Sequence, residues 1–286
     1  MSGPADSGPG VPARLSNLQM RVVSAVVLAA VALAATWAGG VWFRLLAVAI
    51  GAAVFFEWAT MAGRVASTRQ QAVSWVLVGL VLLALAVGMD ARVVFSGALA
   101  AALIVFVLGR FAGEGGWLWL AVAYAALPAG ALAFLRAGDM AGLWAILFLF
   151  AVVWATDTLA YFVGRAVGGP KLAPSISPGK TWSGAIGGAA AGTLAGIGVA
   201  AVAASPASPW LIGLAALVLS VLSQAGDLFE SGLKRRFGVK DSGWMIPGHG
   251  GVMDRVDGLV AAAIALYVVG ALAAGVDMPA HGLFGP

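Results

Sequence analysis

Acidic and basic side chains gather in one short stretch of a chain that otherwise carries few charges. Only 10% of the 286 residues are charged, yet residues 227–257 hold five acids and five bases. Carboxylate oxygens suit Mg²⁺, which normally keeps coordination positions for substrate phosphates, and basic side chains also meet phosphate oxygens. The stretch therefore predicts phosphoryl-group chemistry, in which cations neutralise developing negative charge. Its members are Asp227, Glu230, Asp241, Asp254 and Asp257, with Lys234, Arg235, Arg236, Lys240 and Arg255.

Spacing assigns these acids to helices. If the apolar run that ends near residue 225 continues as a helix, four polar residues follow at i, i+3, i+4 and i+7 and share one face. Asp254 and Asp257 lie three residues apart at the start of another apolar run. Two helix ends would thus present carboxylates. The four residues on the first helix are Asp227, Glu230, Ser231 and Lys234.

Single residues have ordinary explanations as well. Residues 234–236 alone could be a topology signal or a lipid-headgroup patch, and Asp254 could simply pair with Arg255. His249, among glycines, could be a general base or a hydrogen-bonded structural histidine. Glu57, inside an apolar run, could line the site or make a buried polar contact, and the second interpretation is favoured. The whole cluster, rather than any one member, indicates a site.

A second polar loop ends in Gly179-Lys180-Thr181. A phosphate-binding P-loop needs another glycine five residues before Gly179, and that position is Pro174. The loop is therefore not a P-loop. Ser177, Lys180 and Thr181 can still reach phosphates, because they precede the start of a helix and helix N-termini favour anions.

Membrane-spanning helices must position these residues. Hydrophobic residues make up 62% of the chain, and a helix needs about 20 mostly apolar residues to cross the hydrocarbon. No stretch alternates in polarity as a spanning strand would. We predict an all-α polytopic membrane protein with a disordered tail (1–20), N-terminal helices (21–140) and a C-terminal catalytic region (141–286). The nine predicted spans are 22–38, 41–62, 72–88, 93–108, 117–135, 142–163, 183–204, 209–225 and 256–275.

The distribution of Lys and Arg predicts the orientation. The tail and the even-numbered loops hold 13 of the 16 basic residues, and the odd loops hold three. Since cytoplasmic loops are enriched in Lys and Arg, the N-terminus is expected in the cytoplasm. The loops 164–182 and 226–255 fall on that side. Three separate helices then bring Asp157, Asp227 and Asp254 to the cytoplasmic face.

Composition excludes several classes of function. The chain has no cysteine, so disulfides, thiolate metal sites and a Cys nucleophile are impossible. The net charge of +4 is modest and the bases are dispersed, which argues against nucleic-acid binding. An ion-coupled transporter remains an alternative, although such proteins place charges near the bilayer midplane, often in repeated halves.

Four segments resemble the phosphatidate cytidylyltransferase (CDP-diacylglycerol synthase) family. Residues 231–257 closely resemble its signature, and the segments 155–161, 177–181 and 226–231 resemble three shorter family motifs. One departure is Gly179, which stands where many members have Lys. The four segments read SGLKRRFGVKDSGWMIPGHGGVMDRVD, ATDTLAY, SPGKT and GDLFES.

The resemblance implies a reaction in which CTP and phosphatidic acid give CDP-diacylglycerol and pyrophosphate. It also implies Mg²⁺ and a homodimer in the inner cell membrane whose site faces the cytoplasm, while a second cation shared with Asp257 or Asp157 is our own hypothesis. Another membrane lipid phosphoryl or nucleotidyl transferase is the enzymatic alternative. Residues that match the family's metal centre are Asp227, Ser231 and Asp254. The predicted catalytic residues are Lys180, Lys234, Arg235, Lys240, Asp241, His249, Arg255 and Asp257, and the predicted substrate-binding residues are Ser177, Thr181 and Asp157.

Overall fold

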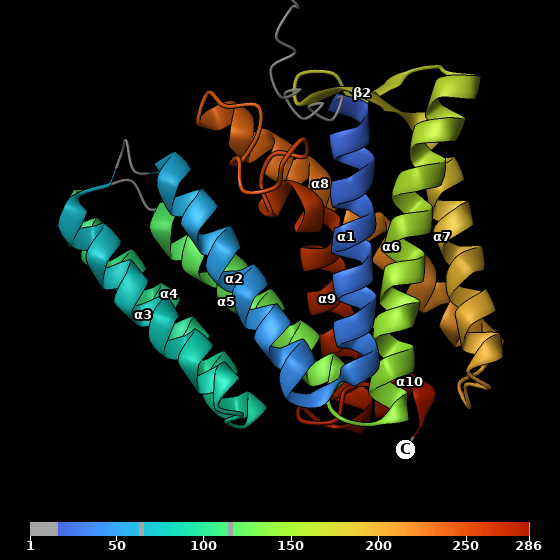
Figure 1. Cartoon of the computed structure of the whole chain (residues 1–286), viewed down its shortest axis with the longest axis horizontal. Coiled ribbons are helices and arrows are strands. Elements are labelled where there is room, and N and C mark those ends of the chain that lie inside the picture. The colour runs from blue at the N-terminus through green and yellow to red at the C-terminus, as the bar shows by residue number, and fades with distance from the viewer. Residues whose placement is uncertain (1–16, 63–65, 114–116, 286) are drawn as a thin grey trace, which may run out of the picture.

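The computed structural model describes residues 17–62, 66–113 and 117–285 (Figure 1). Within these ranges nine helices are long and apolar enough to span a membrane, which confirms the predicted fold class. The helices are α1 (Asn17–Ala38), α2 (Gly40–Ala62), α3 (Thr68–Ala86), α4 (Ala91–Phe111), α5 (Trp117–Arg136), α6 (Met140–Val167), α7 (Trp182–Val202), α8 (Pro209–Arg236) and α9 (Met253–Ala274), followed by the short α10 (His281–Phe284).

Several boundaries differ from the predicted ones. Helix α1 begins at Asn17, so the last four residues of the predicted tail 1–20 are helical, and residues 1–16 lie outside the described ranges. Helix α8 continues to Arg236, as the spacing of its polar residues predicts. Helix α9 begins at Met253, ahead of the apolar run, which puts Asp254 in its first turn.

Between α6 and α7 the described residues form a β-hairpin, which the sequence does not predict. Strand β1 (Lys171–Ala173) pairs antiparallel with β2 (Ser177–Thr181). The Ser-Pro-Gly-Lys-Thr segment is therefore a strand that leads directly into α7. Thr181 ends the strand, and its hydroxyl accepts a hydrogen bond from the Gly184 amide (3.1 Å) and so caps α7.

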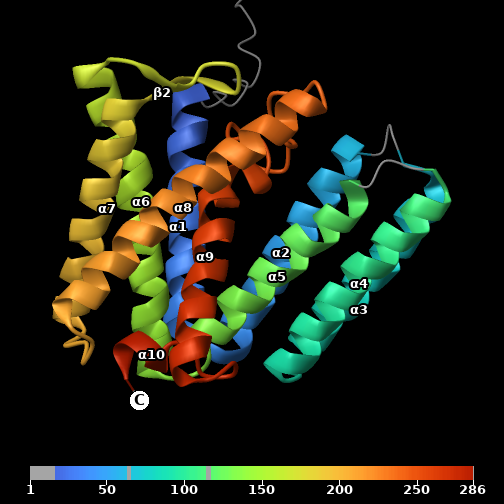
Figure 2. The ribbon, with the colours of Figure 1, turned by 180° about the vertical axis from the view of Figure 1, so that it is seen from behind.

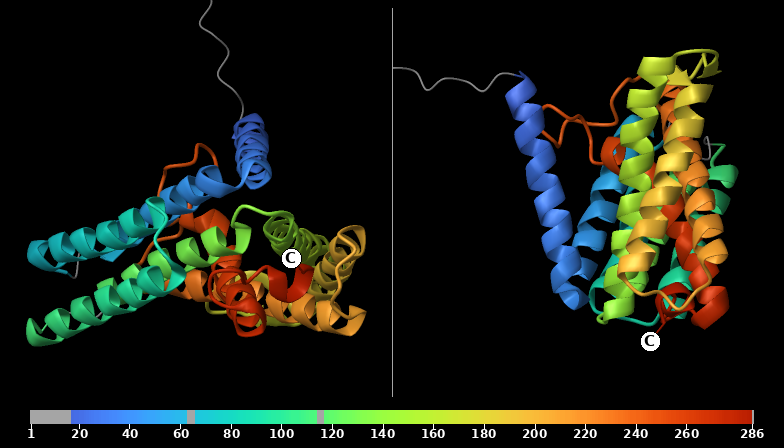
Figure 3. Two further views of the ribbon diagram at one scale, coloured as in Figure 1. Left: turned by 90° about the horizontal axis from the view of Figure 1, so that it is seen from below. Right: turned by 90° about the vertical axis from the view of Figure 1, so that its right-hand side faces the viewer.

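The helices form two groups with α9 between them. Helices α2 to α5 pack together on one side, and α6, α7 and α8 pack on the other (Figures 1 and 2). Helix α9 contacts α5 and α8 and so joins the groups. Helix α1 stands apart from the rest along most of its length (Figure 3).

Helices α6 and α7 approach closely because α7 carries a row of buried glycines, Gly184, Gly188, Gly192 and Gly196. A Cβ atom at Gly188 would lie 2.7 Å from the Thr156 carbonyl oxygen of α6. Small residues at this spacing allow such contact between membrane helices. The row is thus used for packing within the chain, and it fixes the hairpin against α6 and α8.

Candidate active site

Asp227 on α8 is held from two sides at one end of the bundle. The Lys180 ammonium on β2 forms an ion pair with Asp227 Oδ2. The Ser231 hydroxyl, one helical turn further along α8, donates to Asp227 Oδ1 (3.3 Å). The hairpin therefore delivers a cation to the acid that the sequence predicts as a metal ligand.

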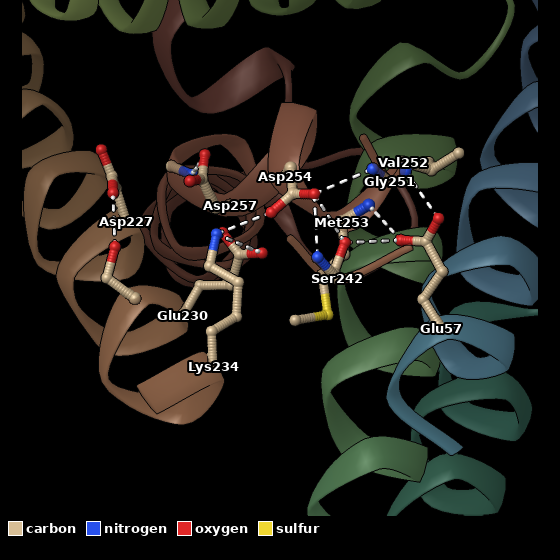
Figure 4. Close-up of polar contacts among 12 residues, drawn as sticks. Glu57, Asp227, Glu230, Lys234, Ser242, Gly251, Val252, Met253, Asp254 and Asp257 are labelled. Atoms are coloured by element: carbon tan, nitrogen blue, oxygen red, sulfur yellow. Dashed lines mark hydrogen bonds and ion pairs between the residues drawn. The ribbon is translucent and has the colours of Figure 1, made fainter. Parts of the chain in front are cut away.

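Asp254 accepts hydrogen bonds from four donors at the start of α9 (Figure 4). Its Oδ1 lies 2.6 Å from Lys234 Nζ. Its Oδ2 accepts from the Gly251 amide (2.8 Å) and lies 3.0 Å from both the amide and the hydroxyl of Ser242. A carboxylate in the first turn is also favoured by the helix dipole. Asp254 is thus buried, charged and rigidly oriented.

Glu57 reaches this site from α2, far away in the sequence. Its carboxylate accepts from the amides of Val252 and Met253, both at 2.8 Å. Because Val252 gives α9 no side-chain cap, Glu57 satisfies donors that would otherwise be unpaired. The Ser242 hydroxyl lies 2.9 Å from Glu57 and 3.0 Å from Asp254, so it links the two acids. The favoured interpretation, a buried polar contact, holds, and this contact supports Asp254.

Helical spacing correctly predicts that Glu230 shares a face of α8 with Asp227, but it gives Glu230 no role in the site. Its side chain is fully buried, 3.4 Å from Lys234 Nζ, and neither carboxylate oxygen accepts a hydrogen bond. It faces Asp257, whose Oδ1 accepts from the Gly258 amide (2.7 Å). Buried charges of this kind need compensation. The i+3 spacing from Asp227 was the only local clue to its position.

Together these acids exceed the bases that face them. Five carboxylates interact with three basic side chains, which leaves two negative charges if all are ionised. In Figure 4, Asp257 lies between Asp227 and Asp254. Gly226 permits this, since a Cβ there would lie 2.6 Å from the Asp257 carbonyl oxygen of α9. The acids are Asp157, Asp227, Glu230, Asp254 and Asp257, and the bases are Lys180, Lys234 and Arg255.

The oxygen donors of this set suit a hard divalent cation in their chemistry. Among the residues that the structure describes, however, no three acids or histidines stand at ligand spacing for one ion. Asp227 and Asp254 are each engaged by a lysine. The described residues thus offer carboxylate oxygens for a cation but no assembled site for one.

A cavity of about 680 Å³, which we call the polar cavity after the charged side chains among its lining residues, opens beside Asp227. Helix α6 contributes Asp157, whose side chain is exposed to this space, and β2 contributes Ser177 and Lys180. Thr181 borders the cavity, but it is buried and its hydroxyl caps α7. The cavity therefore gathers the three predicted substrate-binding residues and one predicted catalytic lysine.

Gly179 also borders this cavity, and a Cβ atom there would meet nothing within 4 Å. A side chain at this position would enter open space. We expect Gly179→Lys to lower the KM for an anionic nucleotide about threefold, because an added partly exposed cation contributes about 0.5–1 kcal/mol. Steady-state kinetics with Gly179→Gln as the uncharged control checks this. An equal change in both variants would show that charge is not the cause.

The other predicted residues lie at the edges of the site. Arg235 is exposed and donates from Nε to the Ile176 carbonyl oxygen (3.4 Å) in the hairpin. Lys240 and Asp241 are exposed on the segment between α8 and α9. Arg255 borders a second cavity together with His249. The structure thus brings Asp157, Lys180, Asp227, Ser231, Lys234, Asp254 and Asp257 together and leaves Arg235, Lys240, Asp241 and His249 around them.

His249 lies between α8 and α9 in surroundings that disfavour its protonated form. Partial burial and the positive charges of Arg255 and Arg21 lower the pKa of the imidazole. Its Nδ1 atom is buried and has no hydrogen-bond partner. Among the residues that it describes, the structure therefore shows no hydrogen bond at Nδ1 that would hold a structural histidine, and the general-base role stays a prediction.

Comparison with protein families matches residues 19–273 to the cytidylyltransferase family. The chain belongs to this family. The phosphatidate cytidylyltransferase of Brucella suis biovar 1 is 48% identical to this cytidylyltransferase-family chain over 271 residues, covering 93% of this chain and 97% of the relative. The enzyme of the same name from Staphylococcus haemolyticus is 50% identical over 116 residues, 41% of this chain and 45% of the relative. The family likeness therefore extends through the N-terminal helices, where the sequence motifs gave no guidance.

Proposed function

We propose that this protein transfers the cytidylyl group of CTP to phosphatidic acid, giving CDP-diacylglycerol and pyrophosphate. The observation that carries the proposal is the 48% identity, over 93% of the chain, to a protein named phosphatidate cytidylyltransferase. The site supports it, because a cavity that Lys180 borders and an acid cluster meet at one end of membrane-spanning helices. An ion-coupled transporter is disfavoured by the same observations.

In this proposal CTP occupies the polar cavity. Lys180 and Lys234 can exchange their carboxylate partners for phosphate oxygens, which lowers the repulsion between the two anionic substrates. An oxygen of the lipid phosphate forms a bond to the α-phosphorus of CTP, and the bond to the β-phosphate oxygen breaks. Because the attacking phosphate is already an anion, no strong base is needed. Positioning of the two substrates supplies much of the rate.

We further propose that Asp227, Ser231 and Asp254 hold Mg²⁺ and that Asp257 or Asp157 shares a second cation. When bound, such cations neutralise the charge of the phosphates and of the departing pyrophosphate. The support is the excess of carboxylates over bases in the cluster. The chain's own contribution is to fix these oxygens on α6, α8 and α9.

The proposed location is the inner cell membrane, with the site facing the cytoplasm and the protein acting as a homodimer. The location of 13 of 16 basic residues in the tail and even-numbered loops supports this orientation. The site lies at the same end of the bundle as these loops. The homodimer rests on the family resemblance.

Pyrophosphate release tests the activity directly. Purified protein with CTP, phosphatidic acid and Mg²⁺ should release pyrophosphate and form CDP-diacylglycerol in equal amounts, and omission of any one reactant should stop both. A lipid kinase would instead release CDP. A transporter would move solute across liposomes without CTP, and that result without pyrophosphate would contradict the proposal.

A further inference from the structure

A second cavity, of about 310 Å³, lies between α1, α2, α6 and α9. Its wall is apolar over most of its surface, with side chains such as Leu28, Phe43 and Phe150. The polar exceptions are His249 and Arg255, which both lie at the end nearest the acid cluster. The cavity shares no lining residue with the polar one beside Asp227. We call it the α1 groove.

Helix α1 forms the outer wall of this groove and is fastened at both ends. Near the site, the Ser24 hydroxyl lies 2.7 Å from the Pro247 carbonyl oxygen, just before His249. At the far end, Arg136 of α5 donates to the carbonyl oxygens of Thr36 and Trp37. Between these points α1 has no fully buried residue in its most apolar part, and only small side chains such as Ala32 and Ala35 pack partly against the core (Figure 3). Because α1 is attached mainly near its two ends, a cavity remains between α1 and helices α2, α6 and α9.

Three of the α1 side chains that line the groove are alanines, and Leu28 and Val31 complete this wall. Ala25, Ala29 and Ala32 follow at i, i+4 and i+7 and all line the cavity. Larger residues such as Val26 and Val27 point away, with exposed fractions of 62% and 51%. The groove is thus shaped for an apolar chain.

The two ends of the groove define an amphipathic ligand with an anionic head. Arg255 lines the groove from the first turn of α9, and it is close enough to Asp157 of the acid cluster to act on it electrostatically. A guanidinium suits the oxygens of a phosphate. His249 adds an imidazole nitrogen without a partner at the same end. An apolar length with a phosphate-binding end matches a lipid phosphate.

We propose that the α1 groove binds one acyl chain of the phosphatidic acid substrate, with Arg255 meeting the lipid phosphate. This rests on the proposed function. The nucleotide then occupies the polar cavity and the lipid the α1 groove, with α6 contributing residues to both. Two anionic substrates thereby approach the acid cluster from separate sides, as an in-line displacement at the α-phosphorus requires.

Filling the groove tests the proposal. Ala29→Trp should raise the KM for dioleoyl phosphatidic acid about tenfold, because several methylene groups lose their burial. The KM for CTP, and turnover of dihexanoyl phosphatidic acid, should stay near wild type. The matched control is Ala30→Trp, since Ala30 lies at the same depth, is exposed and does not line the groove. Equal kinetics in the two variants would overturn the proposal.

A labelling experiment covers the case in which Ala29→Trp misfolds. The chain has no cysteine, so Ala29→Cys and Ala30→Cys each introduce a single thiol. Dioleoyl phosphatidic acid should slow maleimide labelling at position 29 and leave position 30 unchanged. Equal protection by dioleoyl phosphatidylcholine would mean that a bulk membrane lipid fills the groove, which contradicts the proposal. If the wild-type protein releases no pyrophosphate, the proposed function itself is wrong. If pyrophosphate release is normal but dioleoyl phosphatidic acid does not slow labelling at position 29, only the proposed acyl-chain site is wrong.

Discussion

Asp227→Asn should lower kcat about 1,000-fold and leave the protein folded. Asp227 holds the Lys180 ammonium on one oxygen and accepts from Ser231 on the other. The amide keeps the shape of the side chain but removes its charge, so both a proposed metal ligand and the partner that orients Lys180 are lost. Losses of this size follow when a group that stabilises transition-state charge is removed.

The measurement is pyrophosphate release at saturating CTP and phosphatidic acid, with thermal unfolding to confirm the fold. Asp90→Asn is the matched control, because Asp90 is exposed and makes no side-chain cap at the start of α4, where the next amide, of Ala91, donates to Asp277 beyond the C-terminal end of α9. It should behave as wild type. Turnover of Asp227→Asn within a factor of about ten of wild type would remove Asp227 from the metal role.

Features that depend on neighbouring residues could be predicted from the sequence. The polar i, i+3, i+4 and i+7 pattern correctly extends α8 to Arg236, since helical spacing is local. Hydropathy locates all nine spanning helices of the described residues. The placement of Asp227 and Asp254 on separate helix ends at one side of the bundle follows from these two patterns together.

The hairpin and the paired lysines could not be predicted in this way. Strands β1 and β2 are short, and the prolines and glycine of this segment are typical of a loop. The ion pair of Lys180 with Asp227 joins residues 47 positions apart. It depends on the close packing of α7 against α6, which brings the hairpin over α8. The sequence gives the two charges but not their distance.

Glu230 and Glu57 illustrate a further limit. Both are buried acids, with exposed fractions of 0% and 1%, and hydropathy alone marks each as a costly residue in an apolar helix. Only the packed structure separates them. Glu57 is satisfied by the amides of Val252 and Met253 at the start of α9, whereas Glu230 has only the ion pair with Lys234 and faces other acids. Glu57 therefore supports the start of α9, and Glu230 belongs to the charged cluster.

Glu57→Gln should lower kcat about 10- to 100-fold, although Glu57 lies behind the cluster and is not itself placed at the substrates. The Gln amide can accept with one oxygen only, so its NH₂ group faces an amide donor of Val252 or Met253. The start of α9 must then shift, and Asp254 shifts with it through Ser242. Losses of about 10- to 100-fold are usual when the partner that orients a metal ligand is changed.

The dependence on Mg²⁺ separates this positioning role from a general loss of stability. If Glu57 orients Asp254, Glu57→Gln should raise the Mg²⁺ concentration needed for half-maximal rate about tenfold, and excess Mg²⁺ should restore part of the activity. The KM for CTP should change little, because the polar cavity is formed by α6, α7, α8 and the hairpin. Glu57→Asp, which keeps the charge, should retain more activity than Glu57→Gln. A variant that merely unfolds at lower temperature, with an unchanged Mg²⁺ requirement, would show that Glu57 stabilises α9 without controlling the site.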